Sequence, residues 1–148
     1  MVNMYDELVA TYPIYSIEDG LSEDDWQGWQ VMRNQLHSKV QLVADDLVAT
    51  NIECIMRAIE ENCTTSIIIK PNQIGTITET LQAIKLCKEN NLNTIISHRS
   101  GETEDSFIAD IAIGASAGQI KSGGPCRSER LAKYNRILLI EDMLLDQL

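Results

Sequence analysis

The sequence predicts an α/β fold of parallel strand–helix repeats, and three observations support this prediction. Short apolar runs start about 26 residues apart, and a stretch of helical period follows each run. The runs are apolar at successive positions, which is typical of strands that are covered on both faces. A chain of 148 residues that is 44% hydrophobic is long enough for a domain with its own core. We therefore expect residues 1–148 to form a single domain.

The expected elements can be assigned to residue ranges. The expected strands are Tyr12–Ile17, Lys39–Val43, Ser66–Ile69, Asn93–Ile96 and Gly118–Ile120. The expected helices are Asp24–Leu36, Ile52–Asn62, Thr76–Asn90, Ser106–Ala115 and Ser128–Leu145. Asn51 and Thr76 stand where helix N-caps are needed, and Asn90-Asn91 suits a helix end before the next strand.

Two architectures contain repeats of this kind, the doubly wound sheet and the (β/α)8 barrel, and the repeat alone does not separate them. A complete barrel of eight units takes about 250 residues. About five units are visible in this sequence. If the fold is a barrel, the chain is the C-terminal part of a TIM-type (β/α)8 barrel.

Composition excludes several classes of function. A formal net charge of −10 would repel the phosphate backbone of a nucleic acid. The apolar runs are far shorter than the roughly 20 residues of a membrane span, so we expect no span and a cytoplasmic protein. The residues that bind zinc most often are too dispersed for a zinc site: Cys54, Cys63, Cys87, Cys126, His37 and His98. The glycines around Lys121 do not fit the dinucleotide fingerprint.

Acidic residues follow the first two expected strands. In both architectures ligands bind outside the carboxyl ends of the strands. Glu18 and Asp45 stand there on neighbouring strands and offer the oxygen ligands that Mg2+ prefers. The alternative is that they are helix N-caps or solvated loop acids. Because the acids recur beside cationic residues, we favour a Mg2+ site, although these two residues alone supply too few ligands.

Cationic residues follow the later strands. Lys70 and Lys121 are expected to project into one cleft, where a neighbouring cation lowers the pKa of a lysine and makes it a general base. The alternative for either lysine is a surface salt bridge. Arg99 and Ser100, followed by a glycine, are typical of a phosphate or carboxylate site. His98 beside them is expected to be a substrate contact.

Two helical patterns favour structural roles. Trp26 and Trp29 are three residues apart and are expected to pack their helix on the sheet. A basic helix face is expected to be a structural ion-pair surface, and it consists of Arg127, Arg130, Lys133 and Arg136.

Several segments closely resemble the carboxy-terminal part of the enolases, the phosphopyruvate hydratases. They are SIED at Ser16–Asp19, ADDL at Ala44–Leu47, KPNQIGT at Lys70–Thr76, SHRSGETED at Ser97–Asp105, GQIK at Gly118–Lys121 and RSERLAKYN at Arg127–Asn135. The similarity runs from about Tyr5 to Asp142 and favours bacterial enolases. It implies the barrel rather than the doubly wound sheet.

The resemblance also implies an activity, the Mg2+-dependent interconversion of 2-phosphoglycerate and phosphoenolpyruvate in glycolysis. Glu18 and Asp45 then correspond to two of three carboxylate ligands of the first metal ion. Lys70 corresponds to the general base that removes the C2 proton. The remaining substrate contacts implied are Arg99 and Ser100 on the phosphate, His98 as a further contact, and Lys121 on the substrate carboxylate.

A whole enolase, as the resemblance implies, contains more than this sequence does. The amino-terminal domain, the first barrel strands, the third metal ligand, the catalytic glutamate acid and a mobile loop have no counterpart here. We therefore expect the chain alone to be inactive. The expected partner of this chain is the missing amino-terminal portion of an enolase, or a second chain that supplies it. The full-length protein is expected to be a homo-oligomer, with a secondary presence at the cell surface implied by bacterial enolases. The alternative function is that of a non-catalytic binding or partner-docking fragment.

Overall fold

The structure, a computed structural model, describes residues 1–146 of the chain and divides into two compact units. The first unit is Met1–Thr94 and the second begins at Ile95. The strands are β1 (Ser16–Glu18), β2 (Gln41–Ala44), β3 (Ser66–Ile69), β4 (Asn93–Ser97) and β5 (Gly118–Lys121). The helices are α1 (Val2–Thr11), α2 (Trp26–Leu36), α3 (Ile52–Glu60), α4 (Pro71–Ile74), α5 (Ile77–Glu89), α6 (Phe107–Gly114) and α7 (Ser128–Leu145). This alternation confirms the predicted strand–helix repeats.

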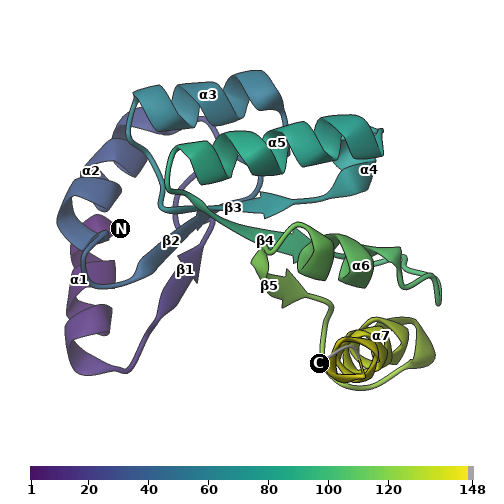
Figure 1. Ribbon diagram of the computed structural model, residues 1–148. Coiled ribbons are helices and arrows are strands. Elements are labelled where there is room, and N and C mark those ends of the chain that lie inside the picture. The colour runs from purple at the N-terminus through teal and green to yellow at the C-terminus, as the bar shows by residue number, and fades with distance from the viewer. Residues whose placement is uncertain (147–148) are drawn as a thin grey trace. The chain divides into compact units, whose positions relative to one another are not determined.

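Three parallel strands form the sheet of the first unit. β1 pairs with β2, and β2 pairs with β3, each pair being joined by a helix in the parallel crossover. All four residues of β3 are buried, as the unbroken apolar run predicts. Helices α3 and α5 lie side by side over this sheet (Figure 1). The carboxyl ends of β1, β2 and β3 therefore meet at one edge.

Both predicted N-caps are confirmed. The Asn51 side chain accepts hydrogen bonds from the backbone N–H groups of Glu53 and Cys54 at the start of α3. The Thr76 hydroxyl accepts one from the Glu79 N–H at the start of α5. Each cap satisfies donors that the first helical turn leaves unpaired, which fixes where the helix begins after its loop.

The two tryptophans of α2 differ in their surroundings. Trp29 is fully buried, as predicted, and its indole N–H donates to the Ser22 carbonyl. Trp26 is only half-buried, and the guanidinium of Arg57 on α3 stacks over its ring at 3.9 Å from the centroid. Trp29 is thus buried as expected, whereas Trp26 makes a cation–π contact with a neighbouring helix.

Two strands begin later than predicted, and two helices were not predicted. β1 starts at Ser16 rather than Tyr12, because Pro13 lacks an N–H and the Ile14 N–H closes a turn on the Tyr12 carbonyl. β2 starts at Gln41, since the preceding N–H groups still bond to the end of α2. α1 was not predicted, and α4 is a single turn that follows Lys70 directly.

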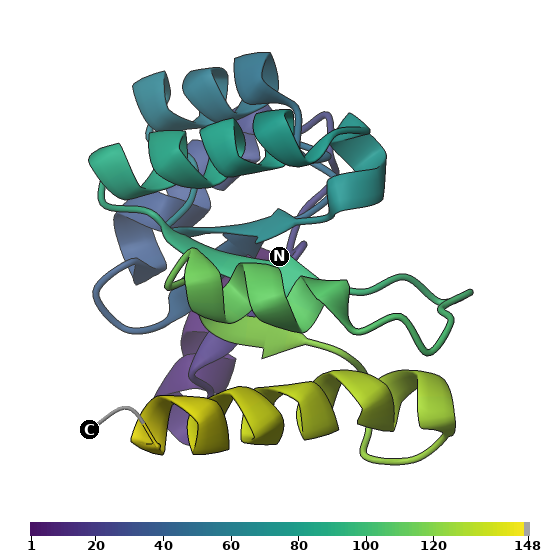
Figure 2. The ribbon, with the colours of Figure 1, turned by 45° about the vertical axis from the view of Figure 1, so that its right-hand side comes forward.

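The second unit contains most of β4 together with α6, β5 and α7. α6 and α7 pack against each other (Figure 2), and the Arg136 guanidinium of α7 makes a bidentate ion pair with Asp110 of α6. Lys133, predicted to lie on a surface, is instead fully buried. The basic face is therefore only in part a surface of ion pairs. No helix within residues 1–146 is both long and apolar enough to cross a membrane.

Substitution of the α3 cap should measurably weaken the first unit. Asn51→Ala removes the acceptor of two backbone N–H groups, so we expect the free energy of unfolding to fall by about 1 kcal/mol. Asn51→Asp keeps an acceptor and should stay within about 0.5 kcal/mol of the original protein. Urea denaturation measures both values. Equal destabilisation by the two variants would show that the cap is not what Asn51 contributes.

Candidate active site

The strand register places three predicted site residues on one face of the sheet. Glu18 pairs with Val43 on β2, and Val43 pairs with Ser66 on β3. Residues two apart on a strand share a face, so Asp45 lies on the face of Val43, and Lys70, four residues beyond Ser66, lies on that face too. Glu18, Asp45 and Lys70 therefore follow three adjacent strands on the same side.

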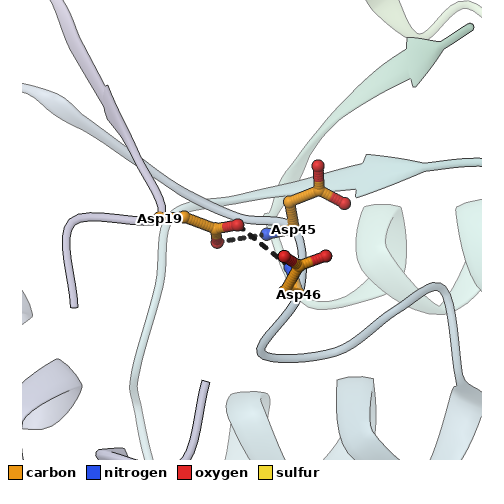
Figure 3. A group of neighbouring side chains, drawn as sticks. All are labelled: Asp19, Asp45 and Asp46. Carbon is orange, nitrogen blue, oxygen red and sulfur yellow. Dashed lines mark hydrogen bonds between the residues drawn. The ribbon is translucent and has the colours of Figure 1, made fainter. Parts of the chain in front are cut away.

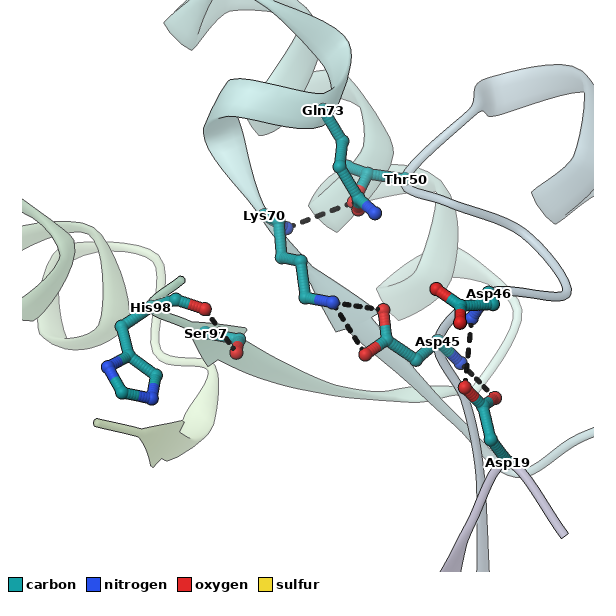
Figure 4. A network of polar contacts seen from close by, with 8 residues as sticks. All are labelled: Asp19, Asp45, Asp46, Thr50, Lys70, Gln73, Ser97 and His98. Atoms are coloured by element: carbon teal, nitrogen blue, oxygen red, sulfur yellow. Dashed lines mark hydrogen bonds and ion pairs between the residues drawn. The ribbon is translucent and has the colours of Figure 1, made fainter. Parts of the chain in front are cut away.

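The buried pair of Lys70 and Asp45 forms the centre of this site. The Lys70 ammonium donates to both carboxylate oxygens of Asp45, each at 2.6 Å (Figure 4). The two side chains are only 11% and 8% exposed. Two opposite charges that are withdrawn from water stabilise one another only in close and well-directed contact, and this geometry provides it. The pair fixes the ends of β2 and β3 relative to each other.

A second acidic residue, Asp19, organises the backbone beside this pair. Its carboxylate accepts hydrogen bonds from the N–H groups of Asp45 and Asp46, at 2.9 and 3.2 Å (Figure 3). Asp19 has a φ of +44°, so the chain turns out of β1 at this residue. Burial raises the pKa of the Asp19 carboxyl, while the two N–H donors act in the opposite direction. Asp19 thus joins the ends of β1 and β2.

Oxygen donors converge at these strand ends in a way that fits a hard cation. One carboxylate oxygen from each of Asp19, Asp45 and Asp46 lies within 4.8 Å of the others. Asp45 is buried, Asp46 is exposed, and Glu18 is exposed at the end of β1. Carboxylate oxygens are the ligands that Mg2+ prefers, so the donor chemistry fits the predicted ion. Of the two predicted ligands, this group contains Asp45 and not Glu18. Asp19 and Asp46 were not predicted, and their only signal in the sequence was adjacency to the predicted ligands.

The second unit holds the predicted anion site in the loop after β4. Arg99 and Ser100 are exposed at the loop tip. The Arg99 N–H donates to the Glu102 carboxylate at 2.8 Å, so Glu102 folds the loop back on itself. Lys133, with a fully buried side chain, contacts Glu102 at 3.0 Å and donates to the Thr103 carbonyl at 2.6 Å. A buried ammonium with several oxygen partners fixes the loop to α7.

His98 and Lys121 lie at the ends of β4 and β5. The His98 N–H donates to the Lys121 carbonyl at 2.9 Å, which brings the two backbones together. The buried Nδ1 of His98 has no hydrogen-bond partner within residues 1–146. Burial lowers the pKa of the His98 imidazole, and the charges of Arg130, Lys121 and Lys133 lower it further, while the Glu102 carboxylate acts in the opposite direction. That Lys70 and Lys121 share one cleft stays a prediction.

Comparison with known proteins identifies the family. Residues 1–148 match the family described as "Enolase, C-terminal TIM barrel domain". The chain belongs to the enolase family. It is 56% identical over 144 residues to the enolase of Natranaerobius thermophilus, which covers 97% of this chain and 34% of that protein. The enolase of Helicobacter hepaticus is 54% identical over 146 residues, 99% of this chain and 34% of its own length.

The extent of the match bounds what this enolase-family chain contains. The chain spans about a third of the length of the curated relatives it matches. The enolase of Helicobacter pylori strain HPAG1, at 57% identity, likewise aligns over 34% of its length. The family description assigns the fold as the C-terminal TIM barrel domain, which decides between the two architectures that the repeat allowed. The α/β fold and the enolase resemblance are thereby confirmed.

The Glu102 contacts predict a pH dependence of stability for this enolase-family chain. Burial raises the pKa of the Glu102 carboxyl, but the Arg99 N–H and the Lys133 ammonium outweigh burial and hold it below its ordinary value. A carboxyl with a lowered pKa in the folded state stabilises the protein above its ordinary pKa and loses that contribution as the pH falls. The stability advantage over Glu102→Gln should therefore shrink between about pH 6 and about pH 3.

Urea unfolding of both proteins across this pH range measures the difference. Glu104→Gln, at an exposed position of the same loop, is the matched control and should change the free energy of unfolding by less than about 0.5 kcal/mol. A constant difference between the original protein and Glu102→Gln at all pH values would contradict the proposed pairing with Lys133.

Proposed function

We propose that this chain is the part of an enolase that carries the general base, with Lys70 removing the C2 proton of 2-phosphoglycerate. The observation that supports it is the buried contact of Lys70 with Asp45, at the carboxyl ends of adjacent parallel strands. Such strand ends are where barrel enzymes hold their catalytic groups. Lys70 is nearly excluded from water at this place, so its amine is positioned to meet a substrate rather than to be solvated.

The proposed reaction moves two protons and two electron pairs. Neutral Lys70 takes the C2 proton at Nζ, and the C–H electron pair moves into the substrate carboxylate. That pair then forms the C2–C3 double bond as the C3 hydroxyl leaves with a proton from an acid outside this chain. The Lys70 ammonium formed in this way is the species that the Asp45 carboxylate holds by two hydrogen bonds. Asp45 thus stabilises the protonated base.

Glu18 and Asp45 are the residues we propose to hold Mg2+. Bound there, the ion would offset the second negative charge that the substrate carboxylate acquires when the proton leaves. Mg2+ commonly retains several waters and needs only a few carboxylates from a protein. Asp46 and Asp19 lie close enough to orient such waters, since one oxygen of each lies within 4.8 Å of an Asp45 oxygen.

The second unit would bind the rest of the substrate. We propose that Arg99 and Ser100 contact the phosphate, that His98 supplies a further contact, and that Lys121 pairs with the substrate carboxylate. The Glu102 and Lys133 pair supports this because it fixes the backbone at Arg99 through the loop. A loop held in advance loses less conformational freedom when an anion binds.

The whole protein would supply what lies outside these residues. We propose a cytoplasmic homo-oligomer, in which the upstream portion provides the third metal ligand and the acid. A polypeptide of only these 148 residues should then show no dehydration of 2-phosphoglycerate, since catalytic residues that act as a unit fail together.

The experiment that tests the base is isotope exchange at C2 in the full-length protein. Lys70→Ala should abolish the exchange of the C2 proton of 2-phosphoglycerate with deuterated solvent, because it removes the amine that we propose as the acceptor of that proton. Nuclear magnetic resonance of the substrate follows the exchange directly and does not require the hydroxyl to leave. Lys39→Ala is the control, since Lys39 pairs with Asp6 and precedes the amino end of β2, and this variant should exchange the C2 proton normally. Exchange that survives Lys70→Ala would exclude Lys70 as the base.

A further inference from the structure

Thr50 stands out as a strained and fully buried residue between Asp45 and α3. Its φ is +57°, in the left-handed region that a β-branched residue rarely adopts. The preceding residue, Ala49, also has a positive φ, of +43°. Thr50 has no exposed surface. Strain of this kind persists only where the surrounding structure imposes it, and it is concentrated at functional sites.

The hydroxyl of Thr50 is the centre of a closed set of hydrogen bonds around Lys70 (Figure 4). It accepts the backbone N–H of Lys70 at 2.9 Å and donates to the Gln73 side-chain oxygen at 2.9 Å. The Gln73 N–H donates in turn to the Lys70 carbonyl at 2.9 Å. Both backbone polar groups of Lys70 are thereby fixed. Thr50 binds the N–H, and Gln73, which Thr50 contacts, binds the carbonyl.

The loop that carries Thr50 also carries the partner of the Lys70 side chain. Asp45 holds the Lys70 ammonium, and the N–H groups of Val48 and Ala49 both bond to the Asp45 carbonyl. The loop from Asp45 to Thr50 therefore contacts Lys70 twice. Asp45 binds the side-chain ammonium, and Thr50 binds the backbone N–H. Because β3 ends at Ile69, no strand neighbour within the described residues performs this task for the Lys70 N–H.

We propose that Thr50 is a positioning residue for the general base: its hydroxyl fixes the backbone from which the Lys70 side chain reaches the substrate. This inference rests on the proposed function of Lys70. The left-handed backbone of Thr50 is what directs its hydroxyl at the Lys70 N–H across the sheet edge. Removing the hydroxyl leaves a buried N–H without its partner and allows the end of β3 to shift. Misplacement of a catalytic group by about 1 Å is enough to slow a reaction up to a hundredfold.

The test uses three variants of the full-length protein. Thr50→Gly removes the hydroxyl but adopts the observed backbone without strain, so it is the deletion that should fold. Thr50→Ser retains the hydroxyl and should restore the original behaviour. Asn51→Ala, at the next residue, weakens the α3 cap and leaves the Lys70 contacts intact, which makes it the control for general loss of stability.

The decisive readout is the kinetic isotope effect with substrate deuterated at C2. Thr50→Gly should lower kcat about tenfold to a hundredfold with little change in KM, and it should raise the isotope effect on kcat because proton removal becomes slower than later steps. Thr50→Ser should stay within about twofold of the original protein. A loss of folded enzyme would lower kcat without changing the isotope effect, so an unchanged isotope effect in Thr50→Gly would overturn the inference.

Lys70→Ala measured alongside separates the two proposals. If Lys70→Ala abolishes C2 exchange while Thr50→Gly resembles the original protein, Lys70 is the base and the positioning role of Thr50 is wrong. If Lys70→Ala retains exchange, the proposed function itself fails, and the role of Thr50 fails with it. An Asn51→Ala variant with the same raised isotope effect as Thr50→Gly would also overturn the inference, because the effect would then come from loop stability.

Discussion

The ion pair between Lys70 and Asp45 is the interaction on which the candidate site depends. Both side chains are nearly excluded from water, so each needs the other, and breaking such a pair from one side costs about 3–5 kcal/mol. That dependence fixes the register at the ends of β2 and β3 where chemistry is expected. Asp19 links this ion pair to the end of β1, because its carboxylate accepts the Asp45 N–H. Thr50 adds a contact to the backbone of Lys70, because its hydroxyl accepts the Lys70 N–H. The polar contacts at this edge form one connected network.

The second unit uses the same physical device for a different purpose. Lys133 is buried in full and donates to the carbonyls of Thr103 and Glu129 as well as contacting Glu102. Its charge is satisfied within the protein, so it holds the loop while Arg99 at the loop tip stays exposed. The buried cation of α7 fixes the loop, and the exposed cation of the loop is the one that we propose to contact an anion.

Much of the fold and of the candidate site could be predicted from the sequence. A buried parallel strand is apolar along its length, so the first polar residue after an apolar run marks the place where the chain leaves the sheet. The strand ends at Asp45 and Lys70 followed from that rule. Asp19 could not be predicted, since its role depends on a turn with positive φ rather than on strand alternation. Lys133 was misread as a surface residue because helical spacing shows its basic neighbours, and not the oxygen atoms of Glu102 and Thr103 that surround it.

A double-mutant cycle tests most directly the claim that Lys70 and Asp45 hold each other at the strand ends. Lys70→Met keeps the side-chain length without the charge, and Asp45→Asn keeps the shape without the charge. The free energies of unfolding of both single variants and the double variant are measured in metal-free buffer. The structure predicts a coupling of at least about 1 kcal/mol, with the double variant less destabilised than the sum of the single ones. Additivity within about 0.5 kcal/mol would contradict it, because residues that do not interact contribute independently.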